Sequence, residues 1–264
     1  MLESRSTVHL RGLCLTENSC AVLASALSSK SQNLTELDLS YNYLQDSGVK
    51  KLFKGLKSGN CRLEILSLTN CNITDAGCLA LYEALESNSS SQLKKLNLSL
   101  NRLGDSGVEK LCYLLKKEHC KLTNLLLVKC DLKKEGCEHL ASALSTDHSK
   151  LIELNLSKNN LENEGVKELC KGLESEKCKL EILRLERCGI TDEGCAALTE
   201  ALRKKEIPLK KLNLNKNRMS MATMNTLTDL LKNCELEALR ENQGSREEND
   251  FYMYSSEFYE LQKI

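Results

Sequence analysis

Leu34–Asn42 reads LTELDLSYN, and close copies of this segment recur along the chain. Some copies end in asparagine, like the first, and between them lie sister segments that end in cysteine, such as LEILSLTNC at Leu63–Cys71. The copies begin at steps of 29 or 30 residues, at Leu34, Leu63, Leu93, Leu122, Leu151, Leu180 and Leu209. A fixed period of this length predicts a stack of repeated units, each of which contacts mainly its neighbours.

Each repeat contains a strand pattern followed by a helix pattern. Leu37 and Leu39 alternate with polar residues, as in a strand with one buried face. Val49 and the apolar residues three, four and seven positions after it form one face of a helix. The motif L-x-x-L-x-L-x-x-N/C-x-L is that of the leucine-rich repeat. We therefore predict an α/β fold: a leucine-rich repeat solenoid, or horseshoe, with about eight parallel strands on the concave face and helices on the convex face.

The repeat pattern also predicts the domain boundaries. Residues 1–240 are expected to form one repeat domain, since Val8–Leu10 aligns with a later strand and Leu236 resembles one more strand start. Residues 241–264 are expected to be a polar linker and an aromatic C-terminal tail. Three interpretations of the tail stay open: a partner-binding or phosphorylated motif, a cap folded onto the last strand, or an incidental terminus.

The residue that ends each strand is expected to have a structural role. A buried asparagine amide can bond the backbone groups of the turn, and without such bonds it would cost about 1–3 kcal/mol. Cysteine occupies the same position in alternate repeats. These positions form a predicted Asn/Cys ladder: Asn42, Cys71, Asn101, Cys130, Asn159, Cys188 and Asn217.

Composition limits the function classes. The chain has 37 Lys and Arg and 37 Asp and Glu, so a net charge of zero gives no overall attraction to nucleic acid or to an acidic membrane. No apolar run has the length of a transmembrane helix, and residues 1–15 do not resemble a signal peptide. We expect neither nucleic-acid binding nor membrane association.

The 14 cysteines fall mostly into columns at fixed repeat positions. Cysteines of alternate repeats would lie about 10 Å apart, too far for a disulfide or a shared metal. We therefore predict small buried side chains with free thiols, which favours a reducing, cytoplasmic location.

The chain lacks the motifs of common catalytic sites. It contains neither a P-loop nor H-E-x-x-H, and its four histidines lie at different repeat positions. We predict no catalytic residues, no metal and no cofactor.

The expected helices carry lysines on their outer side. These lysines could form a basic patch, but interspersed glutamates such as Glu109 and Glu168 favour an ordinary solvated face. They are Lys50, Lys51, Lys54, Lys110, Lys167 and Lys171.

Several phrases carry a family resemblance. LSYN at Leu39–Asn42, GVKKL at Gly48–Leu52 and CNITDAGC at Cys71–Cys78 resemble the C-terminal repeats of NOD-like receptors, and the 29-residue alternation is similar to that of ribonuclease-inhibitor-like repeats. The resemblance implies a non-catalytic module that senses ligands or binds proteins in a cytosolic innate-immune receptor. It also implies a possible partner, the nucleotide-binding NACHT module, which this chain does not contain.

Partner contacts are expected on the concave face, from residues that alternate with the buried leucines. The middle strand differs from the others because Leu126 and Val128 would form an exposed apolar pair, which is typical of a binding hot spot. The predicted partner-binding set is Glu36, Asp38, Asn97, Asn124, Leu126, Val128, Asn155, Arg184, Glu186 and Asn213.

The alternative hypothesis is a stand-alone inhibitor or adaptor, either ribonuclease-inhibitor-like or of the F-box type. An inhibitor of a basic ribonuclease needs an acidic surface. The concave positions offer four acidic and four basic residues, which does not favour it: Glu36, Asp38, Glu153 and Glu186 against Arg11, Lys95, Arg184 and Lys211.

Overall fold

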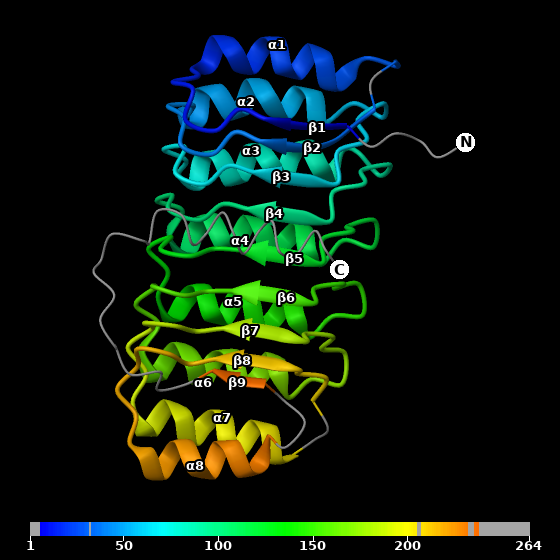
Figure 1. Cartoon of the computed structure of the whole chain (residues 1–264). Helices are drawn as coiled ribbons and strands as arrows, with labels where there is room; N and C mark the ends of the chain where they lie inside the picture. The colour runs from blue at the N-terminus through cyan, green and yellow to red at the C-terminus, as the bar shows by residue number, and fades with distance from the viewer. Residues whose placement is uncertain (1–5, 32, 205–206, 232–234, 238–264) are drawn as a thin grey trace.

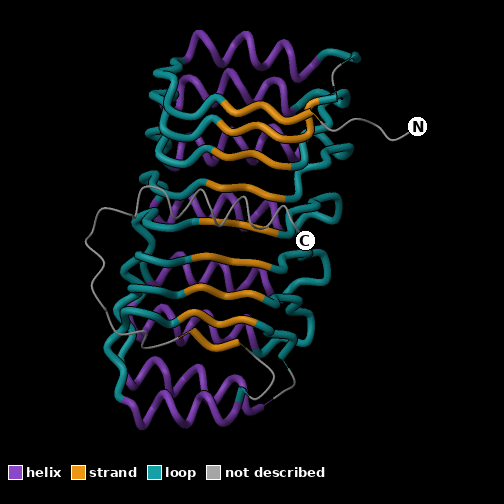
Figure 2. The backbone as a smooth tube through the Cα atoms, viewed as in Figure 1, coloured by secondary structure: helices purple, strands orange, loops and turns teal. Residues whose placement is uncertain are grey.

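The computed structural model describes residues 6–31, 33–204, 207–231 and 235–237. Strands and helices alternate along the chain and form two layers, a sheet in front and a row of helices behind it (Figure 1, Figure 2). The sequence prediction of an α/β leucine-rich repeat solenoid is thereby confirmed.

The strands are short and all parallel. Their order in the sheet is their order in the chain, so every connection joins neighbouring strands. They are β1 (Ser6–His9), β2 (Leu34–Asp38), β3 (Ile65–Ser67), β4 (Lys95–Asn97), β5 (Asn124–Leu126), β6 (Glu153–Asn155), β7 (Ile182–Arg184), β8 (Lys211–Asn213) and β9 (Glu235–Glu237). The described part of the chain thus contains nine strands. This is one more than expected, because the segment around Leu236 also pairs.

Each helix follows a strand and returns the chain to the start of the next one. The helices are α1 (Glu17–Ser28), α2 (Gln45–Leu56), α3 (Asp75–Glu86), α4 (Gly104–Leu115), α5 (Lys134–Leu144), α6 (Glu162–Leu173), α7 (Asp192–Lys204) and α8 (Met221–Leu230). None of the helices in the described ranges is long and apolar enough to cross a membrane.

The core lies between the two layers. Leu37 and Leu39 are fully buried beneath the helices, as the alternation in their strand predicts. In α2 the predicted apolar face is buried as well, and the same positions are buried in α4 and α6. Each repeat therefore contributes a strand face and a helix face to one continuous core.

Successive helices are linked through the first turn of each. The Asp46 carboxylate accepts hydrogen bonds from the Thr74 backbone N–H at 2.9 Å and from the Thr74 hydroxyl at 2.7 Å. The Asp105 carboxylate likewise accepts from the Lys133 and Gly136 backbone N–H groups, both at 2.9 Å. A side chain of one repeat thus satisfies backbone N–H groups at the start of the following helix, which have no partner inside their own helix.

Some predictions fall outside the described residues. The aromatic tail, the boundary between residues 240 and 241, and the thiol of Cys234 all belong to this group.

Candidate functional site

The face of the sheet that points away from the helices, here called the concave face, carries side chains in rows. In-register pairing aligns equivalent residues of successive strands. One row contains Lys95, Asn124, Glu153, Ile182 and Lys211; the next contains Asn97, Leu126, Asn155, Arg184 and Asn213. The row of Asn97 continues through Ser67 to Asp38.

Two members of the predicted partner-binding set, Val128 and Glu186, lie just after their strands. The Val128 backbone N–H donates to the Ser99 hydroxyl at 3.2 Å, and the Glu186 backbone N–H donates to the Ser157 hydroxyl at 3.2 Å. They belong to a third row, parallel to the other two. The structure therefore brings the whole predicted set onto one face.

The prediction that Leu126 and Val128 form an exposed apolar pair is wrong. Leu126 is only 2% exposed and Val128 is fully buried at 0%. Both lie in the middle of the sheet, where Leu126 has Asn97 and Asn155 as neighbours on adjacent strands. These two residues are therefore packing residues in this structure.

Burial extends to other members of the set. Five polar members are also buried: Glu36, Asp38, Asn97, Asn155 and Glu186. Asn124, Arg184 and Asn213 keep part of their surface open. The partly exposed members of the predicted set therefore lie on β5, β7 and β8.

Four of the polar side chains accept a hydrogen bond from the backbone just after their own strand, where the chain turns. The Asp38 carboxylate accepts from the Ser40 backbone N–H at 2.9 Å, and the Asn97 side-chain oxygen accepts from Ser99 N–H at 3.0 Å. Asn155 and Asn213 make the same bond two residues ahead, at 3.0 and 2.9 Å. This is an Asx turn, so these side chains shape the turn as well as the face.

Glu153 is the centre of the polar network on this face. Its side chain is only 1% exposed, and it accepts hydrogen bonds from Asn124 Nδ2 at 2.7 Å and from Arg184 Nη1 at 2.9 Å. A buried carboxylate requires such partners, and removing one typically costs about 3–5 kcal/mol. Burial also lowers the pKa of the nearby Lys95 ammonium, against the opposing effect of Glu153 and Glu36. The predicted set omits Glu153, although its two partners are members.

The Asn/Cys ladder holds neighbouring repeats together. Asn101 Oδ1 accepts from the Cys71 and Ile73 backbone N–H groups, both at 3.0 Å, and its Nδ2 donates to the Leu68 and Leu98 carbonyls at 2.8 and 2.9 Å. Asn42, Asn159 and Asn217 make the equivalent bonds. The thiols at the alternate positions, Cys71, Cys130 and Cys188, each donate to a leucine carbonyl at 3.2 or 3.3 Å.

A row of basic residues borders the concave face, and the sequence analysis did not identify it. It occupies the position just before the ladder residue in four consecutive repeats: Lys129, Lys158, Arg187 and Lys216. We call it the basic row. Its signal in the sequence is the recurrence of positive charge every 29 residues, which is visible only when the repeats are aligned.

The backbone at the basic row has the conformation that this position also has in earlier repeats, at Tyr41, Asn70 and Leu100. All four residues have positive φ, between 51° and 61°, a conformation that favours glycine or asparagine and costs other residues about 1 kcal/mol. Successive members lie on adjacent rungs, since Lys129 N–H bonds Ser157 O and Lys158 N–H bonds Glu186 O. Lys216 pairs with the Glu186 carboxylate at 3.1 Å, whereas Lys129 and Arg187 have no ion pair among the described residues. These two members of the row are therefore available to an acidic partner.

The cysteines have the buried positions that their columns predict. Of the thirteen in the described residues, twelve are buried and Cys14 is exposed. Burial raises the pKa of the Cys130 and Cys112 thiols to about 12. Within the described ranges, no group of three or more His, Cys, Asp or Glu side chains could hold a metal ion.

Comparison with known proteins identifies the repeats. The family model described as "Leucine Rich repeat" matches residues 30–53, 59–81, 89–112, 147–170 and 176–198. Ribonuclease inhibitor of Mus musculus is 45% identical over 121 residues, which cover 46% of this chain and 26% of the inhibitor. NACHT, LRR and PYD domains-containing protein 3 of Bos taurus is 48% identical over 113 residues, which cover 43% of this chain and 11% of that protein.

A solved structure, the TLR13–ssRNA13 complex, overlaps 78% of this chain and 25% of its own chain, with a TM-score of 0.46 and 20% identity. This chain spans about a quarter of the length of ribonuclease inhibitor and about a tenth of the length of NACHT, LRR and PYD domains-containing protein 3. The chain carries leucine-rich repeats related to those of ribonuclease inhibitor and of the NACHT, LRR and PYD domains-containing proteins.

Proposed function

We propose that this chain is a non-catalytic, protein-binding repeat module that senses ligands for a cytosolic innate-immune receptor. The relation of its repeats to those of NACHT-containing proteins supports the receptor context. The observation that carries the binding role is the basic row beside a concave face whose central carboxylate, Glu153, is already paired. Together they favour a protein partner, or a NACHT module, that presents an acidic surface to the later repeats.

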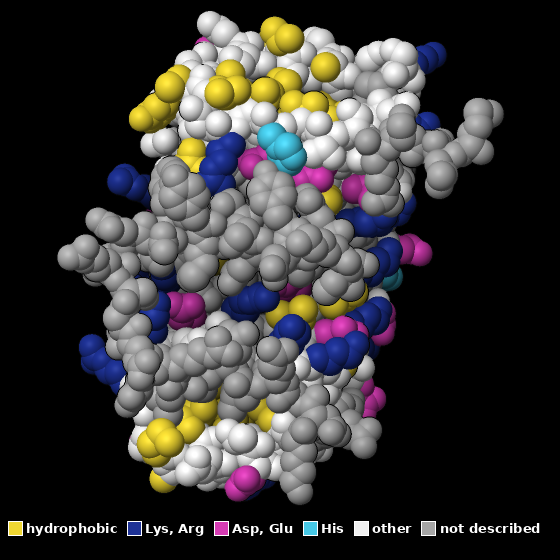
Figure 3. Space-filling view, in the orientation of Figure 1, with side chains coloured by type: hydrophobic (Ala, Val, Ile, Leu, Met, Phe, Trp, Pro, Cys, Tyr) yellow, Lys and Arg dark blue, Asp and Glu magenta, His cyan; other side chains and the backbone are white. Residues whose placement is uncertain are grey.

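The concave face supports this role through its rigidity. Asn124, Glu153 and Arg184 hold one another in place across three adjacent strands. When the polar side chains of a surface are already held in place, binding a partner costs less conformational entropy than when binding must first order them. Mixed charges along this face are visible in the space-filling view (Figure 3). Specificity would come from matching these charges, while the basic row would speed the encounter.

The alternative is a stand-alone inhibitor or adaptor, either ribonuclease-inhibitor-like or of the F-box type. Capture of a basic enzyme needs uncompensated acidic groups. Here Glu153 pairs with Arg184 at 2.9 Å, and Glu186 pairs with Lys216 at 3.1 Å. With the basic row alongside, the charge distribution favours an acidic partner over a basic one.

The decisive experiment reverses charge in the basic row. Proteins would be captured from cytosol by the wild-type chain and by Lys129→Glu/Arg187→Glu, and quantified by mass spectrometry. We expect the double variant to lose specific partners with acidic surfaces. The matched control, Lys30→Glu/Arg62→Glu, makes the same charge change at exposed sites away from this row and should retain them.

Two outcomes would contradict the proposal. Partners that bind the two double variants equally would show that the basic row takes no part. Inhibition of pancreatic ribonuclease by the wild-type chain would instead support the alternative. Mapping the transcript upstream of Met1 for a nucleotide-binding module would test the receptor context separately.

A further inference from the structure

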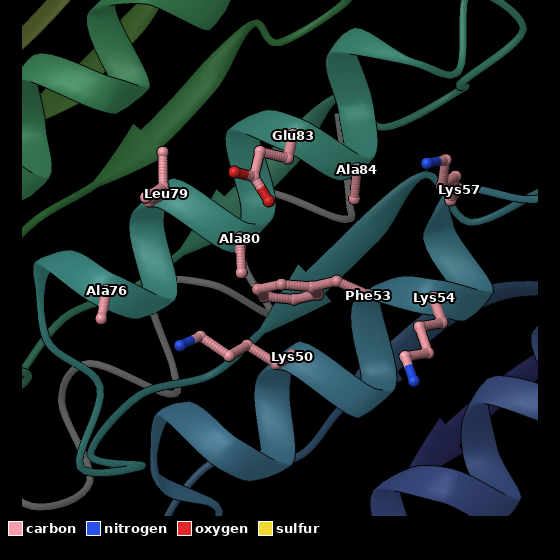
Figure 4. A pocket seen from close by; sticks show the side chains of 9 residues that line it. All are labelled: Lys50, Phe53, Lys54, Lys57, Ala76, Leu79, Ala80, Glu83 and Ala84. Carbon is pink, nitrogen blue, oxygen red and sulfur yellow. The ribbon is translucent and has the colours of Figure 1, made fainter.

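The convex side carries a groove between α2 and α3, with a volume of about 350 Å³. Ala80 lies against the ring of Phe53 at its floor, where Phe53 is itself only 2% exposed, and the Leu79 side chain points away from Phe53 (Figure 4). Three lysines, Lys50, Lys54 and Lys57, line the α2 side of the same groove. Leu79 is 41% exposed, which is high for a large apolar side chain.

The groove exists because the residues that line it on α3 are small. Ala76 corresponds to Glu135 and Glu193 in the two later repeats of the same type, and Leu79 corresponds to Glu138 and Ala196. In the last of these repeats, Glu193 reaches across to Lys167 on the preceding helix, with 2.5 Å between carboxylate oxygen and ammonium nitrogen. The alanine at position 76 leaves the corresponding space open.

The lysines of the groove differ from those elsewhere on the convex side. Lys50, Lys54 and Lys57 have no ion-pair partner among the described residues. Their counterparts are compensated: Lys167 pairs with Glu164 and Glu193, and Lys171 pairs with Glu168. The counterpart of Lys57 is itself acidic, Glu174, and pairs with Lys204. Only one acidic residue, Glu83, lines the groove.

We propose that this groove binds an acidic peptide segment of a partner protein, with one apolar side chain seated over Ala76 and Ala80. The two alanines would cover that side chain in part, and the three lysines would meet flanking carboxylates. This surface is separate from the concave face, so it goes beyond the function proposed above. It would let the module hold two partners at once.

The experiment is a selection from a random 12-residue phage-displayed peptide library on the wild-type chain, with counter-selection on Ala76→Glu. This variant places in α3 the residue that two sibling repeats already carry, so it should fold normally and close the groove by pairing with Lys50. We expect recovered peptides to combine acidic residues with leucine or phenylalanine. A synthetic copy should bind Ala76→Glu and Lys50→Ser/Lys54→Ser at least about tenfold more weakly than the wild type.

Controls separate the groove from general electrostatics. Lys171→Ser, at the position of Lys54 but on α6, should bind the peptide like the wild type. So should Lys129→Glu/Arg187→Glu, which tests the concave proposal. Circular dichroism melting should show that the variants are folded. The proposal fails if no peptide is enriched over Ala76→Glu, if enriched peptides lack acidic residues, or if the lysine variants bind as tightly as the wild type.

Discussion

At the scale of single residues, each asparagine of the ladder satisfies several buried backbone groups at once. An amide side chain has an oxygen that accepts two hydrogen bonds and a nitrogen that donates two. In Asn159 the oxygen accepts from the Cys130 and Leu132 N–H groups at 2.8 and 3.1 Å, and the nitrogen donates to the Leu127 and Leu156 carbonyls, both at 2.8 Å. One side chain therefore satisfies four buried backbone groups in two repeats.

We predict that Asn159→Ala lowers the free energy of unfolding by about 3 kcal/mol, since it leaves these buried groups without partners. Urea denaturation measures the effect. Asn160→Ala is the matched control, because Asn160 is exposed and bonds only the Glu162 carboxylate among the described residues, at 2.9 Å. Equal stability of the two variants would mean that the turn is satisfied without the ladder amide.

The thiols provide a second prediction at this scale. A pKa raised to about 12 leaves only about one Cys130 thiol in 10⁴ ionised at pH 8, and the thiolate is the reactive form. Cys14 is exposed, so a reagent in solution can reach its sulfur directly. We expect Ellman's reagent to react quickly with Cys14 and slowly with the buried cysteines of the native chain, and Cys14→Ser to remove that fast contribution. Rapid modification of Cys130 in the folded protein would contradict its burial.

At the scale of elements, neighbouring helices approach closely where glycine meets alanine. A Cβ at Gly172 in α6 would lie 2.6 Å from the Ala141 Cα and 2.9 Å from the Ala141 carbonyl oxygen in α5. A Cβ at Gly55 in α2 would lie 2.8 Å from the Ala24 carbonyl oxygen in α1. Backbone atoms cannot move aside as a flexible side chain can, so these contacts set the distance between the helices.

We predict that Gly172→Ala destabilises the chain by about 1–3 kcal/mol, even though alanine favours helix, because overpacking forces the two helices apart. Thermal or urea unfolding would measure it. Gly59→Ala should change stability little, since nothing lies within 4 Å of a Cβ at Gly59. A stabilised Gly172→Ala variant would show that α5 and α6 have room to adjust.

At the scale of the whole molecule, each repeat is stabilised by its neighbours, so stability should vary along the stack. β1 lies at one end of the described sheet and three of its four residues are exposed. The adjacent helix α1 buries three residues, whereas α2 buries six. The N-terminal repeat therefore contributes less to the core than the interior repeats.

We predict that amide hydrogens of β1 and α1 exchange with solvent faster than those of β4 to β6, because local opening at the end of a stack breaks fewer contacts. Hydrogen–deuterium exchange with mass spectrometry tests this directly. Uniform protection from β1 to β6 would indicate that another surface covers β1 in solution.

The repeat pattern alone is sufficient to predict the architecture. The 29-residue period, the alternation of Leu37 and Leu39 with polar residues, and the spacing of Val49, Leu52 and Phe53 specify strand, helix and buried face. These signals are local and recur in every repeat. A repeat that departs from the pattern at one position is therefore still recognised by its alignment with the others. The positions of the ladder and of the buried cysteines follow from the same alignment.

Exposure and pairing depend on neighbours in space, which a linear pattern does not contain. Alternation places Leu126 and Val128 on the concave face, but only the tertiary structure shows that they are buried there. The Glu153 network joins residues 29 and 31 positions apart. The open groove at Ala76 depends on whether a side chain of one helix reaches a lysine of the preceding helix. Such contacts are decided by tertiary structure, because burial and ion pairing are properties of the assembled surfaces.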